Sequence, residues 1–460
     1  MSRLIVVSNR VNPPDDPGIA SAGGLAMALA AALRDGKGIW FGWSGETTEA
    51  FTGQPAIRKV GGVEVALVDL EEQDLAEYYD GYANRTLWPL LHYRMDLTAY
   101  ERSFNEGYLR VNERFAETLL PLIRPDDIIW VQDYHLIPLA SELRRRGVSN
   151  RIGFFLHTPW PARRVFNTLP RHRELMETFF AYDLVGFHTR DYLDAFGDYV
   201  VHEMGGRLEN DVARVGNASM RLGVFPIGID VDDFLQSLES ESSRTYFSRA
   251  TTSKLGRKMI IGVDRLDYSK GLEERFLAYE RFLADNPDRA EQVFLLQIAT
   301  PSRTGVEASQ DLRARLDTIG GRINGRHATV DWVPLRYVNL PYRRDELSGL
   351  YRAAEVGLVT PLRDGMNLVA KEYVAAQDEA DPGVLILSEF AGAAEQMKDA
   401  LIVNPLSPED VADAIRRGLD MPLAERQRRW QSLMDGVTSG NVTAWRDAFV
   451  AMLSAERGGI

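Results

Sequence analysis

Short apolar runs alternate with segments of helical periodicity along the whole chain. Runs such as RLIVVSN, DDIIWVQD and RIGFFLH are rich in β-branched and aromatic residues and indicate buried strands. Between such runs apolar residues recur at helical spacing, and the residues at 136, 139, 140 and 143 place one apolar stripe on a helix. Strands that alternate with helices in this way predict parallel sheets covered by helices, an α/β fold.

The alternation occurs in two halves, which predicts two doubly wound, Rossmann-like domains. Residues 236–258 separate the halves; they are rich in Ser, Thr and charge and lack periodicity, so they are the best boundary candidate. We therefore predict an N-terminal domain over 1–235 and a C-terminal domain over 236–445, facing a cleft. Residues 446–460 are predicted as a helix that packs back on the N-terminal domain. In such folds ligands bind at the carboxyl ends of the strands.

Composition narrows the chemistry that the chain can perform. It has 53 Lys and Arg against 66 Asp and Glu, a formal charge of −13, and no Cys. Disulfides, thiolate metal sites and thiol nucleophiles are therefore excluded, and the acidic balance argues against a nucleic-acid partner. No apolar run is long enough to span a bilayer, so we expect a cytoplasmic protein with no membrane partner.

Two groups of charged residues follow strands in the second half. Arg265 and Lys270 share one loop, and a guanidinium beside a mobile ammonium suits a diphosphate. Farther along, Asp364 and Gly365 turn before a helix whose first N–H groups are available to a ligand. Each group has a plainer interpretation: a solvated cationic loop for the first, and an ordinary helix N-cap for Asp364.

Polar residues also end the strands of the first half. Arg10 ends the first strand, and Gly24 lies at the start of an alanine-rich helix, where backbone N–H groups can approach a phosphate. Asp133 and His157 follow two later strands, where a buried carboxylate or imidazole needs a partner. A satisfied core histidine is an equally good interpretation of His157 alone. No metal-binding spacing is present among these groups, so no metal is expected.

Taken together, these motifs resemble the trehalose-6-phosphate synthase family of retaining glycosyltransferases with the GT-B fold. The matching strings include VVSNR, EYYDGYANRTLWPLLHYR, DRLDYSKGL and TPLRDGMNLVAKEYVAAQ, and they extend from residue 5 to about residue 405. The resemblance implies transfer of glucose from a nucleotide sugar, UDP-glucose by default, to glucose 6-phosphate. The product is α,α-trehalose 6-phosphate, formed by metal-independent front-face transfer without a cofactor. Family members self-associate, so a homo-oligomer is expected.

The resemblance also assigns roles to residues. Arg265 and Lys270 would stabilise the departing diphosphate, Asp364 would bind glucose hydroxyls, Glu372 would bind the ribose, and His157 would lie beside the transferred glucose. The catalytic residues implied are Arg265, Lys270, His157 and Asp133. The other donor-binding residues implied are Gly24, Met366, Asn367, Leu368 and Val369. The acceptor-binding residues implied are Arg10, Tyr79, Trp88, Asp133, Tyr134 and Arg303.

The sequence departs from the family pattern at two places and leaves alternatives open. Thr304 and Gly305 follow Arg303 where many members have Gly-Asp, and Trp160 stands where Phe is usual. The alternatives are a glucosylglycerol-phosphate synthase that uses glycerol 3-phosphate, a non-catalytic sugar-phosphate sensor and a nucleotide-sugar epimerase. The aromatic acceptor residues favour a hexose phosphate over glycerol 3-phosphate and argue against an epimerase. The complete set of donor residues argues against a sensor.

Overall fold

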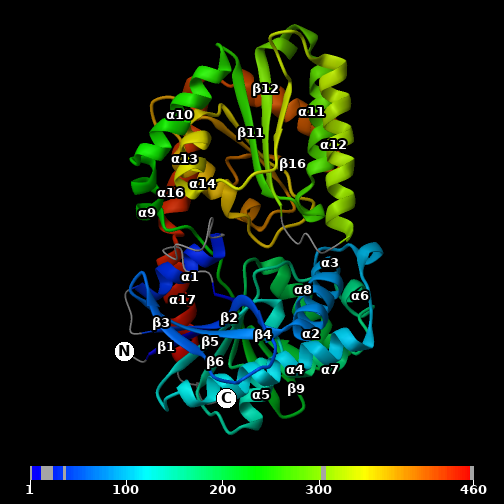
Figure 1. Cartoon of the computed structure of the whole chain (residues 1–460), viewed down its shortest axis with the longest axis vertical. Coiled ribbons are helices and arrows are strands. Elements are labelled where there is room, and N and C mark those ends of the chain that lie inside the picture. The colour runs from blue at the N-terminus through cyan, green and yellow to red at the C-terminus, as the bar shows by residue number, and fades with distance from the viewer. Residues whose placement is uncertain (1–2, 12–23, 35–37, 302–306, 456–460) are drawn as a thin grey trace. The chain divides into compact units, whose positions relative to one another are not determined.

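The structure is a computed structural model that describes residues 3–11, 24–34, 38–301 and 307–455 (Figure 1). The chain forms two compact units. Unit 1 comprises Met1–Ile227 and Val442–Ile460, and unit 2 comprises Gly228–Asn441. Each unit contains one sheet covered by helices, so the predicted α/β class with parallel sheets is confirmed.

Unit 1 contains a ten-stranded sheet in the order β3-β4-β2-β1-β5-β6-β7-β10-β9-β8. The strands are β1 (Leu4–Arg10), β2 (Ile39–Thr48), β3 (Ala56–Val60), β4 (Val63–Glu71), β5 (Ile128–Gln132), β6 (Arg151–Phe155), β7 (Leu184–Phe187), β8 (Arg207–Glu209), β9 (Val212–Val215) and β10 (Ala218–Val224). In this sheet order, each strand from β4 through β2, β1, β5, β6 and β7 to β10 is parallel to the next. Strand β3 at one edge and strands β9 and β8 at the other pair antiparallel. Central strands such as β5 are fully buried, which explains their continuous apolar sequence.

The helices of unit 1 include one long π-helix, η1. The longer helices are α1 (Gly24–Arg34), η1 (Leu75–Leu87), α4 (Arg102–Leu119), α5 (Leu139–Arg145), α7 (His172–Phe179), α8 (Arg190–Glu203) and α17 (Val442–Ser454). Short turns are α2 (Glu72–Asp74), α3 (Trp88–Leu91), η2 (Met95–Leu97), η3 (Leu120–Leu122), η4 (Tyr134–Leu136) and α6 (Arg163–Phe166). The apolar stripe predicted from residues 136 to 143 is buried, although the α-helix begins only at Leu139.

Unit 2 contains a six-stranded parallel sheet in the order β13-β12-β11-β14-β15-β16. Its strands are β11 (Lys258–Arg265), β12 (Val293–Thr300), β13 (Leu335–Val338), β14 (Val356–Val359), β15 (Val384–Ser388) and β16 (Leu401–Val403). Its helices are α9 (Val231–Leu238), α10 (Glu241–Lys254), η5 (Tyr268–Lys270), α11 (Leu272–Asp285), η6 (Pro287–Gln292), α12 (Glu307–His327), α13 (Arg344–Ala353), α14 (Leu368–Ala376), η7 (Gly392–Glu395), α15 (Pro408–Asp420) and α16 (Leu423–Ser439). In Figure 1, α10, α13 and α14 lie on one side of β11, and α11 and α12 lie on the other.

The segment 236–258, expected to be an irregular linker, is mostly helix α10. This helix buries only Ser243 and Ala250, so it has almost no apolar stripe for a sequence pattern to detect. It packs closely on α13, where the hydroxyl of Ser348 donates to that of Ser243 at 3.1 Å. The division between the units falls after Ile227, before α9 begins.

The helix predicted for residues 446–460 corresponds to α17, which begins earlier, at Val442. It belongs to unit 1 and contacts β6, β7 and α1, although it follows unit 2 in the sequence. Its buried side chains include Trp445 and Phe449, which pack against Trp130 of β5 at ring distances of 4.6 Å. The chain therefore passes from unit 1 to unit 2 and returns.

Candidate active site

The two charged loops predicted in the second half, which carry Arg265 with Lys270 and Asp364 with Gly365, meet in unit 2. We call them the donor loops. β11 ends at the exposed Arg265, and Asp267 then caps the short turn η5 by accepting a hydrogen bond from the Ser269 N–H at 2.9 Å. Lys270 ends this turn, and its Nζ donates to Oδ2 of Asp364 at 2.5 Å. An ion pair thus joins two groups that are 94 residues apart in the sequence.

The Asp364 loop is held by backbone contacts, not by a helix cap. The backbone N–H of Asp364 donates to the Phe390 carbonyl, and the Asp364 carbonyl accepts from the Gly392 N–H, both at 3.1 Å. The N-cap of α14 is Asn367, whose side chain accepts from the Ala370 N–H and donates to Asp364 at 3.0 Å. Asp364 is therefore not the helix N-cap, and its carboxylate lies between Lys270 and Asn367.

The other predicted donor residues lie in or beside the first turns of α14. Met366 is buried, while Leu368 and Val369 are partly exposed at the start of the helix. Glu372 is partly exposed one turn farther along, and no hydrogen bond or ion pair joins its carboxylate to another described residue. Burial raises the pKa of Glu372, and the positive charge of Arg344 opposes that rise. A carboxylate in this state is available to a ligand hydroxyl.

Asp133 and His157 lie together in unit 1, after the neighbouring strands β5 and β6. The backbone N–H of His157 donates to Oδ1 of Asp133 at 3.1 Å, and its ring Nε2 lies 2.8 Å from Oε1 of the buried Gln132. Asp133 has φ of 72°, a strained conformation for a non-glycine residue that is typical of functional sites. Burial, assisted by the nearby His188, lowers the pKa of His157 well below its ordinary value, so the imidazole is neutral at physiological pH.

The predicted acceptor residues of unit 1 form a connected aromatic group. Tyr79 lies 5.3 Å from Trp43 and 6.1 Å from His135, measured between ring centroids. His135 in turn lies 4.0 Å from Tyr134, which lies 5.8 Å from Trp88.

Arg10 ends β1 beside this aromatic group, with its guanidinium 5.7 Å from the Trp43 ring. The family resemblance assigns no acceptor role to His135 and matches Trp43 less certainly than the other residues. Nevertheless, the His135 ring joins Tyr79 to Tyr134, and the Trp43 ring joins Tyr79 to Arg10. The available signal for His135 was its place in the turn η4 directly after β5, where ligand contacts lie in such folds. Trp43 lies within β2, in register with Arg10 of β1. We call Arg10, Trp43, Tyr79, Trp88, Tyr134 and His135 the acceptor wall.

Two of the predicted features fall partly or wholly outside the residues that the structure describes. Arg303 lies in the segment 302–306, which is outside the described residues, as are Thr304 and Gly305. Gly24 is the first residue of α1, and the preceding Gly23 is not described. Trp160 is buried in the unit 1 core against Phe166, 4.4 Å away between ring centroids.

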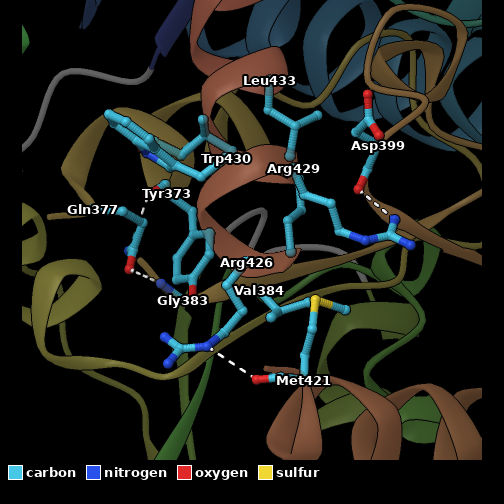
Figure 2. A pocket seen from close by; sticks show the side chains of 12 residues that line it. Tyr373, Gln377, Gly383, Val384, Asp399, Met421, Arg426, Arg429, Trp430 and Leu433 are labelled. Carbon is cyan, nitrogen blue, oxygen red and sulfur yellow. Dashed lines mark hydrogen bonds between the residues drawn. The ribbon is translucent and has the colours of Figure 1, made fainter. Parts of the chain in front are cut away.

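A small pocket elsewhere in unit 2 is not the site. Figure 2 shows that it lies between α14, β15 and α16, with Tyr373 and Trp430 among its lining residues. The guanidinium groups of Arg426 and Arg429 lie in its wall, and both donate to backbone carbonyls. None of the predicted donor residues lines this pocket.

Two further observations concern only the residues that the structure describes. Among them, no three His, Asp or Glu side chains gather in an arrangement that could hold a metal ion. Within the same part of the chain, no helix is both long enough and apolar enough to cross a membrane.

Comparison with known proteins identifies relatives along almost the whole chain. The model of glycosyltransferase family 20 matches residues 6–455. A trehalose-6-phosphate synthase of Sinorhizobium fredii is 49% identical over 99% of both chains.

Solved structures match equally well. A UDP-forming α,α-trehalose-phosphate synthase from Burkholderia xenovorans, in complex with glucose 6-phosphate, is 47% identical with a TM-score of 0.95, over 98% of this chain and 100% of that one. A protein from E. coli bound with UDP-2-fluoro glucose is 45% identical with a TM-score of 0.93, over 98% of this chain and 99% of that one. These neighbours confirm the predicted GT-B fold.

Proposed function

Since the chain belongs to glycosyltransferase family 20, we propose that it transfers glucose from UDP-glucose to glucose 6-phosphate and releases α,α-trehalose 6-phosphate and UDP. The relatives solved with glucose 6-phosphate and with a UDP-glucose analogue support these two substrates. Neither the glycerol 3-phosphate alternative nor the non-catalytic alternative has comparable support. The observation that carries the proposal is the ion pair between Lys270 and Asp364, because it joins a cation suited to a diphosphate to a carboxylate suited to sugar hydroxyls.

In this proposal most donor contacts come from unit 2, and one, Gly24, comes from unit 1. Arg265 and Lys270 neutralise the charge that develops on the departing UDP, and Asp364 accepts hydrogen bonds from glucose hydroxyls. Glu372 accepts from the ribose, consistent with a carboxylate that has no ion pair to a described residue. The remaining donor contacts are assigned to Gly24, Met366, Asn367, Leu368 and Val369, which lie at the starts of α1 and α14.

The acceptor is held by the acceptor wall and by Asp133. Arg10 is assigned to the phosphate, together with Arg303, and the aromatic rings and Asp133 to the sugar. A hydroxyl of glucose 6-phosphate then attacks on the face from which UDP departs, and a diphosphate oxygen takes its proton. Because His157 is neutral, it contributes polar contact beside the glucose without adding charge. The protein's contribution is positioning and charge stabilisation, for which no metal ion is required.

The test is an incubation of UDP-, ADP- and GDP-glucose, each with glucose 6-phosphate or glycerol 3-phosphate. We expect turnover with UDP-glucose and glucose 6-phosphate, giving a non-reducing disaccharide phosphate identified by mass and by two small anomeric couplings. Preferential turnover of glycerol 3-phosphate, or no turnover with any pair, would overturn the proposal. A homo-oligomer and a cytoplasmic location are also proposed, and sedimentation of the purified chain tests the former.

Arg265→Ala and Lys270→Ala test the donor assignment in the same assay. Each variant is expected to lose most of its turnover, since one of the two cations that stabilise UDP is removed. Near-normal turnover in either variant would contradict the diphosphate role of that residue.

A further inference from the structure

Arg275 of α11 is a buried cation that donates hydrogen bonds to the first donor loop, at Lys270, and to Thr360, just before the second. Its side chain is almost completely buried, with an exposed fraction of 1%, so it cannot itself contact a substrate. Its Nη1 donates to Oδ2 of Asp264 at 2.5 Å and to Oε1 of Gln297 at 2.8 Å. Its Nε donates to Oγ1 of Thr360 at 2.9 Å, and its Nη2 to the Lys270 carbonyl at 3.3 Å.

The partners of Arg275 come from three consecutive strands of the unit 2 sheet. Gln297 lies in β12 and Asp264 in β11, directly before Arg265, while Thr360 follows β14 and precedes the Asp364 loop. The fourth partner is the backbone of Lys270 itself. One guanidinium therefore fixes the strand ends and the turn from which Arg265, Lys270 and Asp364 project.

The glycine at position 262 leaves space for the side chains of Arg275 and Gln297. A Cβ atom at Gly262 would lie 2.4 Å from Oε1 of Gln297 and 2.7 Å from Nη1 of Arg275, so any other residue at 262 would displace the network. The planar guanidinium presents its N–H groups in fixed directions, and an ammonium at the same place cannot reach all four partners at once. A buried ion pair contributes little net stability compared with a well-packed apolar pair, so its value here is in geometry.

We propose that Arg275 is a positioning residue that sets the placement of Lys270 and Arg265 at the donor diphosphate. This inference rests on the proposed function, since it assumes that these two cations hold the diphosphate of UDP-glucose. Its prediction is specific: loss of the guanidinium weakens diphosphate binding and slows transfer, while binding of glucose 6-phosphate is unchanged.

The experiment compares Arg275→Lys with the full-length wild-type enzyme by calorimetric titration with UDP and by steady-state kinetics. We expect UDP to bind about 10-fold more weakly and kcat/KM for UDP-glucose to fall about 10- to 100-fold. The KM for glucose 6-phosphate should stay within about twofold. Arg257→Lys is the matched control: Arg257 lies just before β11, at its opposite end, where it bonds to the Glu291 carbonyl and to Asp331. Donor parameters should be unchanged in that variant.

Thr360→Val provides a milder second variant in case Arg275→Lys does not fold. It removes one of the four bonds at nearly constant volume, and UDP affinity should fall about 3- to 10-fold. A lower melting temperature with wild-type UDP affinity and wild-type kinetic constants per folded enzyme, in whichever variant folds, would mean a purely structural role and overturn the inference.

Lys270→Ala separates the inference from the assignment on which it rests. If Lys270→Ala weakens UDP binding while Arg275→Lys and Thr360→Val do not, only the positioning role fails. If Lys270→Ala also leaves UDP binding unchanged, the diphosphate assignment fails and the inference is overturned with it.

Discussion

Glu372 is a partly buried carboxylate of α14 without an ion pair to another described residue. Its pKa is raised from an ordinary 4.5 because burial disfavours the charged form. An acid with a raised folded-state pKa contributes stability below its ordinary pKa, and this contribution is lost as pH rises through the folded value. At neutral and alkaline pH the ionised Glu372 therefore destabilises the fold.

Glu372→Gln is expected to raise the melting temperature at pH 8 by about 2–4 °C and to change it much less at pH 5. The same variant should raise the KM for UDP-glucose, because an amide is a weaker acceptor for the ribose hydroxyls. Scanning calorimetry at the two pH values and donor kinetics measure both effects. Glu379→Gln, at an exposed position, is the control and should show neither. A stabilisation of Glu372→Gln that is equal at both pH values would contradict the charge argument.

His157 makes a second prediction at this scale. Its pKa lies well below 6.5, so the stability that depends on the neutral ring is present above that pH and declines as pH falls toward the folded value. His157→Asn should lower kcat by about 10-fold or more through lost contact with the sugar. Any fall in rate toward low pH that the wild-type enzyme shows above pH 6 should also occur in the variant, because His157 is already neutral at these pH values. Disappearance of that fall in rate in the variant would show that His157 titrates during turnover.

Some of these residue contacts follow from the sequence and others do not. Asp133 and His157 follow strands that the pattern predicts as parallel. Because consecutive parallel strands often lie side by side, as β5 and β6 do, the sequence predicts that these two residues are close together. The pair of Lys270 with Asp364 depends on β14 lying beside β11, and β12 and β13 intervene in the sequence. Local patterns carry no information about that strand order.

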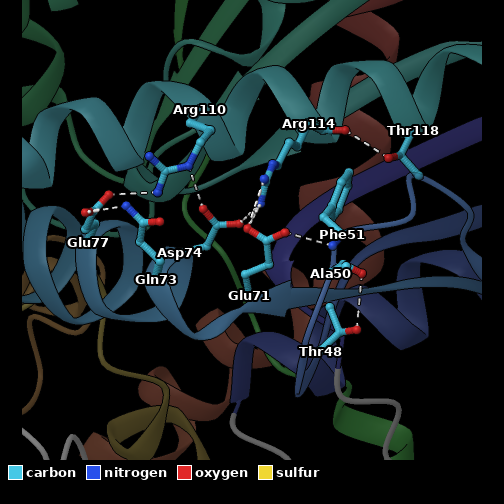
Figure 3. A network of polar contacts seen from close by, with 10 residues as sticks. All are labelled: Thr48, Ala50, Phe51, Glu71, Gln73, Asp74, Glu77, Arg110, Arg114 and Thr118. Atoms are coloured by element: carbon cyan, nitrogen blue, oxygen red, sulfur yellow. Dashed lines mark hydrogen bonds and ion pairs between the residues drawn. The ribbon is translucent and has the colours of Figure 1, made fainter.

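At the scale of elements, the π-helix η1 is held by a network of partly buried charges around the fully buried Asp74 (Figure 3). Asp74 is completely buried directly before η1 and pairs with Arg110 at 2.8 Å and with Arg114, both from α4. Arg110 also pairs with Glu77 of η1 at 2.7 Å. Since η1 carries Tyr79, the network fixes the position of one ring of the acceptor wall. π-Helical segments often occur at functional sites.

Asp74→Asn is expected to lower the free energy of unfolding by about 1–3 kcal/mol. Both arginines lose the charge of their shared buried partner but keep their pairs with Glu77 and Glu71. The KM for glucose 6-phosphate should rise, and the KM for UDP-glucose should not, because η1 belongs to unit 1. Urea unfolding and kinetics with each substrate varied measure these effects. Asp96→Asn breaks the exposed pair with Arg94 and should change little. Equal losses in the two variants, or a change in the donor constant alone, would contradict the assignment.

The sequence pattern predicts the apolar elements well and the polar ones poorly. Strands such as β5 and β15 are continuous buried runs, which the apolar pattern predicts directly. The pattern predicts a linker in place of helix α10 because this helix packs on α13 through small residues instead of an apolar stripe. The π-helix η1 is also not predictable from local patterns, because the arginines that pair with Asp74 and Glu77 lie on α4, farther along the chain.

At the scale of the whole molecule, the last helix is essential to the first unit. Helix α17 places Phe449 over β6 and β7, where a Cβ atom at Gly153 or Gly186 would lie 2.7 to 2.8 Å from its ring. The ring also stacks on Trp130 at 4.6 Å and contacts Phe225 at 5.1 Å. The core of unit 1 is therefore complete only after unit 2 has been synthesised and the chain has returned.

Phe449→Ala is expected to destabilise unit 1 by about 3–5 kcal/mol, because two glycines leave no side chain that could fill the space of the lost ring. Hydrogen exchange should become faster in β6 and β7, while β11 and β12 of unit 2 keep their protection. Met452→Ala is the matched control, since Met452 lies on the same helix with an exposed fraction of 40% and should cost far less. If β11 and β12 lose protection together with β6 and β7, the two units unfold as one cooperative structure. Unchanged exchange throughout would instead mean that α17 is dispensable to the core it covers.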